Sequence, residues 1–400
     1  MALVESPRFG DAGKSNGTKY NEEVASNERW IVTERKEELL HYKIPEFIPP
    51  YPSGISSYTA KVTKDTYDWL LEHGVDKLFP PKAYDKFVDF NLPGLPARVY
   101  VEYGPQTLDW ASKFFTWLFL LDDILDNTAV GMKRGTLVPV FFELHLLLLW
   151  NFPDDPVLNN SLSQFLNEFP NSAIREQTRE FISEALKKNK NVSMDTAYDG
   201  KMEPIGALLR DLWASSLRTM PAEFNLRLAH TIQDYFLGNL SEAINREDKT
   251  IPSIAEYTIL RRKSGAVEPT IVIYDLYQEV YMPNELFFSS PMKEMMDAVN
   301  DIIVWHNDIM SFKKEMTKGD HVHNLVTLIS YERKDCTYQE CAHIALDMIY
   351  DRIAHLEKAG VDLLAIAPPA YQTVVQRYIK TCQYWISGTH AWHSSSVRYQ

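Results

Sequence analysis

Apolar residues recur along most of this chain at the spacing of one helix face. From Thr59 onward they return every three or four positions, whereas strand-type alternation of apolar and polar residues is almost absent. Proline and glycine separate the periodic stretches, as at Pro93, Gly94 and Pro96. The pattern predicts an all-α protein with helices over residues 66–71, 109–126, 137–150, 172–188, 204–217, 223–242, 253–262, 269–280, 292–316, 338–359 and 369–387.

Several of these predicted helices are apolar well beyond one narrow stripe. Such a helix has to be surrounded by other helices, as in a bundle whose centre is a core or a cavity. We therefore expect one domain over residues 45–400, a helical bundle around a central active-site cavity. Residues 1–44 lack the periodicity, and we expect them to form a disordered segment outside this domain.

Composition and charge exclude several classes of partner. Hydrophobic residues make up 45% of the chain, and the net charge of −13 argues against binding to nucleic acid or to an anionic membrane. The most apolar run, residues 137–150, contains Glu143 and His145 and is too short to span a bilayer. The N-terminus lacks a secretory signal pattern, and the odd cysteine count predicts free thiols in a reducing, cytoplasmic setting: Cys336, Cys341 and Cys382.

Three oxygen-bearing side chains share one face of the predicted helix over residues 292–316. Asn307, Ser311 and Glu315 are each four positions apart, a spacing that aligns them over two helical turns. Hard divalent cations such as Mg²⁺ prefer oxygen ligands of this kind. A helix with a solvated polar stripe would show the same spacing, so this cluster alone leaves two interpretations open.

A second cluster of carboxylates ends the apolar stretch that begins at Phe114. Asp122 and Asp126 are four positions apart and share a face, with Asp123 beside them. Like charges at this spacing repel and would be costly to bury, and bound cations would relieve both costs. Two oxygen-donor clusters on two apolar helices favour a metal site between those helices.

These residues resemble the motifs of class I terpene synthases, with the general look of the fungal sesquiterpene cyclases. The aspartates at 122, 123 and 126 match the family's DDxxD motif, and Asn307, Ser311 and Glu315 match its NSE motif, including a lysine, Lys314, just before the glutamate. The resemblance runs from about residue 60 to the last residues and implies the all-α class I terpenoid synthase fold.

Further positions match family residues that contact diphosphate. Arg261 precedes Asn307 by 46 positions, where microbial members carry the arginine that senses diphosphate. Ser264 and Gly265 then stand at the linker and effector positions, although the linker is more often an aspartate. Arg398 and Tyr399 resemble the family's C-terminal Arg-Tyr pair.

The resemblance implies a role for each of these residues. The metal ligands would be Asp122, Asp123, Asp126, Asn307, Ser311 and Glu315, holding Mg²⁺, three ions in each active site. The diphosphate of the substrate would contact Arg261, Lys314, Arg398 and Tyr399. The residues expected to act on the reacting chain are Asp122, Arg261, Gly265, Phe119 and Trp392, with Phe115 and Trp305 as weaker aromatic candidates.

The resemblance implies Mg²⁺-dependent ionisation of a linear prenyl diphosphate and its cyclisation to a terpene. Farnesyl diphosphate and a sesquiterpene, hydrocarbon or alcohol, are the first expectation, and geranylgeranyl diphosphate is the second. A chain-elongating prenyltransferase, a different metal-dependent phosphohydrolase and a helical binding protein without catalysis are the competing interpretations. Dimerisation is common in the family, and no feature of this sequence decides whether this chain forms a homodimer.

Overall fold

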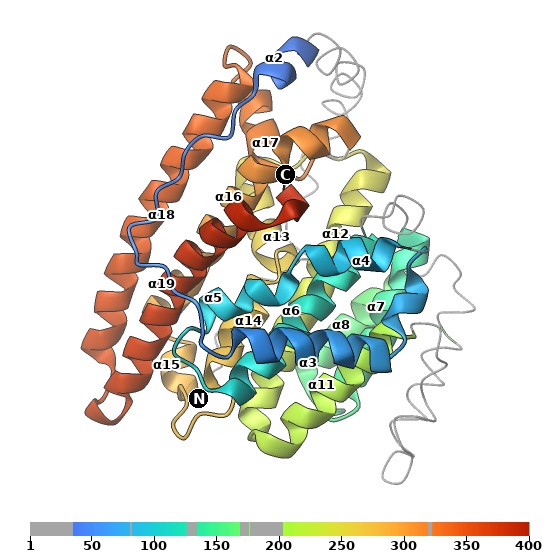
Figure 1. Ribbon diagram of the computed structural model, residues 1–400, viewed down its shortest axis with the longest axis vertical. Coiled ribbons are helices and arrows are strands. Elements are labelled where there is room, and N and C mark those ends of the chain that lie inside the picture. Colours follow the sequence, from blue (N-terminus) through green and yellow to red (C-terminus); the bar gives the residue numbers. More distant parts are fainter. Residues whose placement is uncertain are drawn as a thin grey trace.

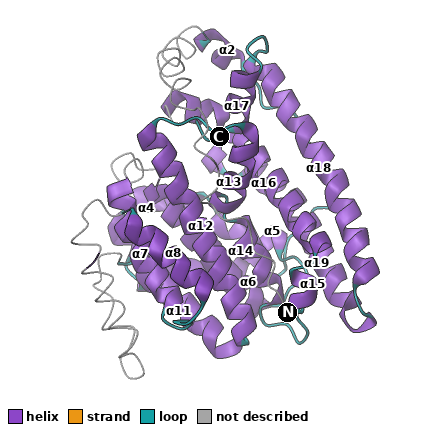
Figure 2. Ribbon diagram, turned by 180° about the vertical axis from the view of Figure 1, so that it is seen from behind, coloured by secondary structure: helices purple, strands orange, loops and turns teal. Residues whose placement is uncertain are grey.

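The fold is all-α, as the sequence predicts. The computed structural model describes residues 35–80, 82–125, 134–168, 176, 203–318 and 322–399. Over these residues, helices and connecting loops account for the whole chain and strands are absent (Figure 2). The expected helix over residues 172–188 lies almost entirely outside the described residues, and Asp126 lies outside them as well.

Ten helices of eleven or more residues form the body of the described structure (Figure 1). They are α3 (Thr59–Glu72), α6 (Pro105–Leu125), α7 (Arg134–Leu149), α8 (Pro156–Asn167), α11 (Ile205–Thr219), α12 (Ala222–Asp248), α13 (Ile254–Ser264), α16 (Ser290–Lys318), α18 (Tyr338–Ile366) and α19 (Gln372–Ser395). Shorter helices connect them: α2 (Lys36–His41), α4 (Ala83–Asp89), α5 (Pro96–Val99), α14 (Val267–Val272), α15 (Asn284–Phe287) and α17 (Leu325–Glu332). Single 3₁₀ turns are η1 (Val75–Leu78), η2 (Leu92–Gly94), η4 (Ile273–Asp275), η5 (Pro369–Tyr371) and η6 (Val397–Tyr399).

The long helices pack side by side around α6, whose residues are buried along almost its whole length. On one flank α16 packs along α18 and beside α19, and on the other α12 packs against α7 and α13 (Figure 1). Aromatic residues fill the centre, including the stacked series of Trp110, Phe114 and Trp117 on α6. None of the described helices combines the length and apolar character needed to cross a membrane.

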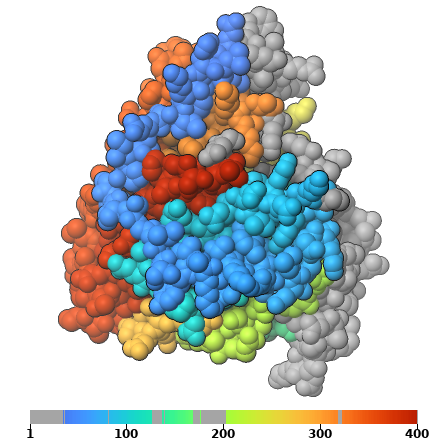
Figure 3. All heavy atoms as spheres, in the orientation of Figure 1, coloured from blue at the N-terminus to red at the C-terminus, as the bar shows by residue number. Residues whose placement is uncertain are grey.

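Part of the segment before residue 45 packs against the bundle. The Tyr42 side chain is buried, and its hydroxyl donates a hydrogen bond to the backbone oxygen of Ile309, 3.0 Å away on α16. The chain then runs along α18 and α19 toward α3, where it is visible as the blue segment on the surface (Figure 3). The packed part of the chain thus begins before residue 45, the start that we expected for the domain.

The expected helix over residues 269–280 is shorter in the structure. It ends as η4 at Asp275, and Tyr277 has a left-handed backbone with a φ of 60°. The buried Asp275 carboxylate accepts a hydrogen bond from the Met282 backbone nitrogen at 3.0 Å and from Arg377 at 3.2 Å, which fixes a turn in place of further helix. The apolar pattern cannot reveal this, because residues on both sides of the turn are buried.

Among the described residues, six helices were absent from the sequence prediction: α2, α4, α5, α8, α15 and α17. Helix α8 follows Pro153 and begins with Pro156, and Asp155 caps it by accepting hydrogen bonds from two backbone nitrogens. Proline in the first turn of a helix starts it rather than breaks it. The three cysteines, all within the described residues, are unpaired as predicted.

Candidate active site

A cavity of about 170 Å³ lies between α6, α16, α19 and the junction of α13 with α14. A single water molecule needs only about 10–15 Å³ of such space, so this cavity is far larger than a packing defect. One end is polar and is lined by Asp122, Arg261, Asn307, Ser311, Lys314, Glu315 and Arg398. The rest is mostly apolar and aromatic, with Leu95, Phe115, Leu118, Phe119, Ile303, Val304, Trp385 and Trp392 in its walls.

The structure brings the three α16 residues together on this cavity. Asn307, Ser311 and Glu315 lie in an unbroken helix, and all three line the polar end. The Ser311 hydroxyl is buried and makes no hydrogen bond of good geometry with the described residues, although it lies close enough to Glu315 to favour that residue's charged form. A buried hydroxyl of this kind needs a partner, and a cation between these oxygens would supply one.

Glu315 has an unusual environment for a carboxylate. Its side chain lines the cavity, and Asn324 Nδ2 donates a hydrogen bond to its Oε2 at 2.9 Å. Burial, followed by repulsion from the Asp308 carboxylate, raises the pKa of Glu315 to about 8. A cation at the cavity would reverse this shift, because it stabilises the ionised carboxylate.

Behind this cluster, Asp308 joins three elements. Its carboxylate accepts hydrogen bonds from the Tyr257 hydroxyl, from the Leu325 backbone nitrogen at 2.9 Å and from Arg261 at 3.2 Å. Asn324 Nδ2 also donates to the Asp308 backbone oxygen at 2.8 Å. This buried carboxylate therefore fixes the positions of α13, α16 and α17 relative to one another.

Arg261 lies between the cavity and this buried network. Its Nη2 donates to Asn307 Oδ1 at 3.1 Å as well as to Asp308, while its Nε is buried without a partner among the described residues. Burial lowers the pKa of Arg261, but Asp308, Tyr257 and Glu242 together raise it well above its ordinary value. The guanidinium is therefore charged, aimed at the cavity and still able to donate hydrogen bonds.

The chain breaks between α13 and α14 at the cavity wall. Helix α13 ends at Ser264, Gly265 follows, and Ala266 has a left-handed backbone with a φ of 55°. The Ser264 hydroxyl donates to the buried carboxylate of Glu242 on α12. The break exposes the backbone of Gly265 to the cavity, where the resemblance expects the effector residue.

The aspartates of α6 are held very differently. Asp122 lines the cavity, but its side chain is 47% exposed, and Asp123 points away from the cavity at 38% exposure. Arg398 donates to both Asp123 oxygens at 2.8 and 3.0 Å and lies 3.5 Å from Asp122 Oδ2. The predicted ligand Asp126 lies outside the described residues, as does the side chain of Tyr399.

Aromatic side chains form two layers across the cavity, between α6 and α19. Phe119 lies against Trp392 with ring centroids 5.4 Å apart, and Phe115 stacks on Trp385 at 5.5 Å. Arg398 sits 5.1 Å above the Phe119 ring, so the outer layer connects to the polar end. Both expected aromatic residues, Phe119 and Trp392, line the cavity, whereas Trp305 is buried away from it.

The sequence analysis assigned no role to Trp385 in the cavity wall or to three residues of the buried network behind it: Tyr257, Asp308 and Asn324. Asp308 lies within the NSE-like stretch, but it does not belong to the four-residue spacing that connects its neighbour Asn307 with Ser311 and Glu315. The position of this aspartate on an apolar helix does indicate a buried contact, since an unpaired buried carboxylate is costly and requires partners. Its partners come from α13 and from the start of α17, and the sequence gives no indication that these segments meet.

Comparison with known proteins places the chain among enzymes of one kind. Residues 172–355 match a family model described as terpene synthase family 2, C-terminal metal binding. An alpha-gurjunene synthase of Marchantia polymorpha is 32% identical over 377 residues, which cover 90% of this chain and 86% of that protein. A 4-epi-cubebol synthase of Streptosporangium roseum, described as (2E,6E)-farnesyl diphosphate cyclizing, is 24% identical over 89% of this chain and 92% of its own.

Solved structures give the same result for the fold. A cucumene synthase variant superimposes with a TM-score of 0.68 at 19% identity, and the match covers 88% of this chain and 100% of that protein's chain. The germacradien-4-ol synthase from Streptomyces citricolor has a TM-score of 0.65 at 18% identity, covering 88% of this chain and 98% of its own. The helical arrangement around the cavity is thus shared with these proteins.

Proposed function

Because the chain belongs to the terpene synthase family, we propose that it ionises farnesyl diphosphate and cyclises it to a sesquiterpene. The relatives named as sesquiterpene or farnesyl-diphosphate-cyclizing synthases support this substrate. The observation that carries the proposal is the two-sided polar end of the cavity. Asp122 from α6 faces Asn307, Ser311 and Glu315 from α16 across one opening, with Arg261, Lys314 and Arg398 around it.

The residues present fit a divalent metal, in agreement with the metal-binding family model. We take this metal to be Mg²⁺, because the donors are amide, hydroxyl and carboxylate oxygens. Asn307, Ser311 and Glu315 would hold it from α16, and Asp122, assisted by Asp123 and Asp126, from α6. Bound Mg²⁺ acts as a Lewis acid that makes diphosphate a better leaving group, and the resemblance implies three ions.

Basic side chains at the polar end bind and orient the diphosphate. Arg261 and Arg398 present forked guanidinium groups, which suit phosphate oxygens, and Lys314 adds a single exposed charge at the mouth. Tyr399, next to Arg398, is assigned one more hydrogen bond. These contacts stabilise the negative charge that grows on the diphosphate as its bond to the first carbon of the chain breaks.

The apolar part of the cavity then holds the allylic cation. The faces of Phe119 and Trp392 stabilise positive charge near the mouth, and Phe115 and Trp385 do so further inside. The bent backbone at Gly265 brings a carbonyl dipole close to the reacting chain. Since these walls are largely apolar, they also exclude water until the ring has closed.

The test is incubation of the purified protein with farnesyl diphosphate and Mg²⁺, followed by gas chromatography–mass spectrometry of a pentane extract. We expect a cyclic C15 product that disappears when EDTA removes the metal. Parallel reactions with geranyl and geranylgeranyl diphosphate identify a different chain length. A longer linear prenyl diphosphate as the product would assign the chain to the prenyltransferases instead. The absence of any product with all three substrates would refute the proposal.

A further inference from the structure

Two consecutive arginines at the end of α13 both bind α16. Arg261 reaches Asn307 and Asp308 at the cavity, as described above. Arg262 points elsewhere and binds Asp301 through two parallel hydrogen bonds, both 2.7 Å long. Asp301 and Asp308 are two helical turns apart, about 10 Å along the axis of α16. The last turn of α13 is therefore held at two separate points on the helix that carries the metal-binding residues.

The backbone near Arg262 is fixed in the same way. Asn300 Nδ2 donates a 2.7 Å hydrogen bond to the Arg262 carbonyl, one of the oxygens left without a partner at the end of a helix. Between the two arginine contacts, Gly265 lies directly on α16, and a Cβ atom added there would stand 2.4 Å from Val304 Cγ1. The break that follows α13 thus has almost no freedom to approach α16 more closely.

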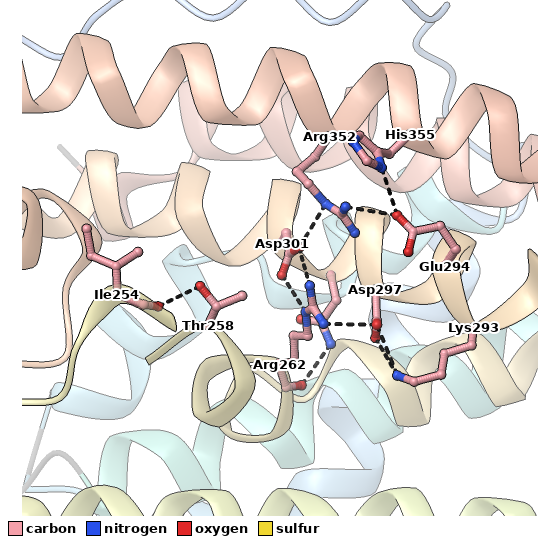
Figure 4. A network of polar contacts seen from close by, with 10 residues as sticks. Ile254, Thr258, Arg262, Lys293, Glu294, Asp297, Asp301, Arg352 and His355 are labelled. Atoms are coloured by element: carbon pink, nitrogen blue, oxygen red, sulfur yellow. Dashed lines mark hydrogen bonds and ion pairs between the residues drawn. The ribbon is translucent and has the colours of Figure 1, made fainter. Parts of the chain in front are cut away.

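Asp301 also connects this junction to the outer helix α18. Its carboxylate is buried, and Arg352 Nε lies 2.9 Å from it on the side opposite Arg262. Arg352 also binds Glu294, which contacts His355, so that the whole network joins α13, α16 and α18 (Figure 4). None of these side chains lines the cavity.

We propose that Arg262, acting through Asp301, is a positioning residue that sets where Arg261 and the Gly265 backbone stand relative to the reacting chain. This inference rests on the proposed cyclase function. A buried carboxylate paired with two arginines resists displacement because each partner that is lost leaves an uncompensated charge. Without the forked contact, the end of α13 can rotate or slide on α16. A shift of about 1 Å at a reacting centre can cost about 100-fold in rate.

The experiment compares three variants under identical conditions. Arg262→Met removes the charge and the fork, whereas Arg262→Lys keeps the charge without the fork. Lys293→Met is the matched control, because among the described residues Lys293 pairs with Asp297, a carboxylate that Arg262 also contacts at 2.9 Å, and the Lys293 side chain is 70% exposed. Each protein is assayed for kcat, KM and product ratio with farnesyl diphosphate, and for melting temperature by circular dichroism.

We expect Arg262→Met to lower kcat about 10- to 100-fold and to raise the share of acyclic and early-quenched products. Arg262→Lys should move the product ratio in the same direction by less, and Lys293→Met should match the wild type. A purely structural role would lower the amount of folded enzyme and leave the product ratio unchanged.

An unchanged product ratio in both Arg262 variants would overturn the inference. If Arg262→Met does not fold, the Arg262→Lys ratio decides alone. A wild-type protein that forms no cyclic product refutes the proposed function itself and this inference with it. An active wild type with unaltered Arg262 variants refutes only the positioning role.

Discussion

The two sides of the polar end differ in how firmly the protein holds them. On α16, Asn307, Ser311 and Glu315 lie in the C-terminal half of a continuous helix, where α13 and α17 contact them. On α6, Asp122 and Asp123 lie at the last described turn of a helix, are 47% and 38% exposed, and both contact Arg398. One side is built into the packed interior, and the other lies at the surface.

This difference teaches what each side contributes. Hydrogen bonds from α13 and α17 hold the α16 side, so its geometry is part of the fold, and the burial of the Glu315 carboxylate makes this arrangement costly in free energy. The α6 side needs little free energy to hold its exposed carboxylates in place. Its contacts can also change, because Arg398 can exchange an exposed carboxylate for a diphosphate oxygen. We therefore expect changes on α16 to affect both stability and activity, and changes on α6 to affect activity alone.

The largest effect should come from removing one ligand on either side. Asp122→Ala and Asn307→Ala should each lower turnover about 1,000-fold or more, equivalent to about 4 kcal/mol of transition-state stabilisation. Product formation is measured by gas chromatography–mass spectrometry, and helical content by circular dichroism should stay that of the wild type. Retained turnover in both variants would refute the two-sided assignment.

The next largest effect concerns the free energy of unfolding, which Asp308→Asn should lower far more than a matched change on the α6 side. It leaves the Arg261 charge without its buried partner and should lower the free energy of unfolding by about 3 kcal/mol. The matched control is Asp123→Asn, which weakens a partly exposed ion pair with Arg398 and should cost about 0–1 kcal/mol. Urea unfolding followed by circular dichroism gives both values, and equal values for the two variants would contradict the comparison.

Arg398→Gln should show the opposite combination. It removes charge-assisted donors from the mouth and should lower kcat/KM about 10- to 100-fold. The melting temperature should stay close to that of the wild type, because the pair it breaks is partly exposed. A large loss of stability with unchanged kcat/KM would mean that Arg398 serves the fold and not the substrate.

The smallest effect concerns pH and the metal-free protein. The folded-state pKa of Glu315 is raised to about 8, first by burial and then by Asp308, so the folded protein binds this proton more tightly than the unfolded chain. This tighter proton binding stabilises the folded state at low pH, and the stabilisation is lost as pH rises from about 4.5 toward 8. The melting temperature in EDTA should fall more steeply over this range for the wild type than for Glu315→Gln, and Mg²⁺ should reduce the difference. Parallel curves for the two proteins would contradict the assigned shift.

The sequence predicted those parts of the site that depend on spacing within one helix. The four-residue intervals of Asn307, Ser311 and Glu315 fix a shared face whatever surrounds it. The helix predicted over residues 253–262 is also present as α13, which ends at Ser264, one residue before Gly265. The site-residue roles themselves stay predictions until they are tested by mutation.

What the sequence could not give are contacts between distant segments. The hydrogen bond of Arg398 to Asp123 and that of Tyr42 to Ile309 depend on how helices pack, and helical periodicity contains no information about partners. Asp275 ends a helix through bonds to Met282 and Arg377 for the same reason. Helix α8 is absent from the prediction because proline separates the predicted helices there, whereas Pro156 stands at the first position of a helix.

The Arg398 contact also has a consequence for how the molecule folds. On the α16 side, Arg261 and Asn307 are 46 positions apart and Asn324 and Asp308 only 16, so one short stretch of chain can assemble that half. Arg398 and Asp123 are 275 positions apart, and the entropic cost of closing a loop grows with its length. Contacts of high sequence separation also tend to form slowly. In refolding experiments the α16 side of the cavity should become protected first, and the Arg398–Asp123 contact at the opening should be the last part to form.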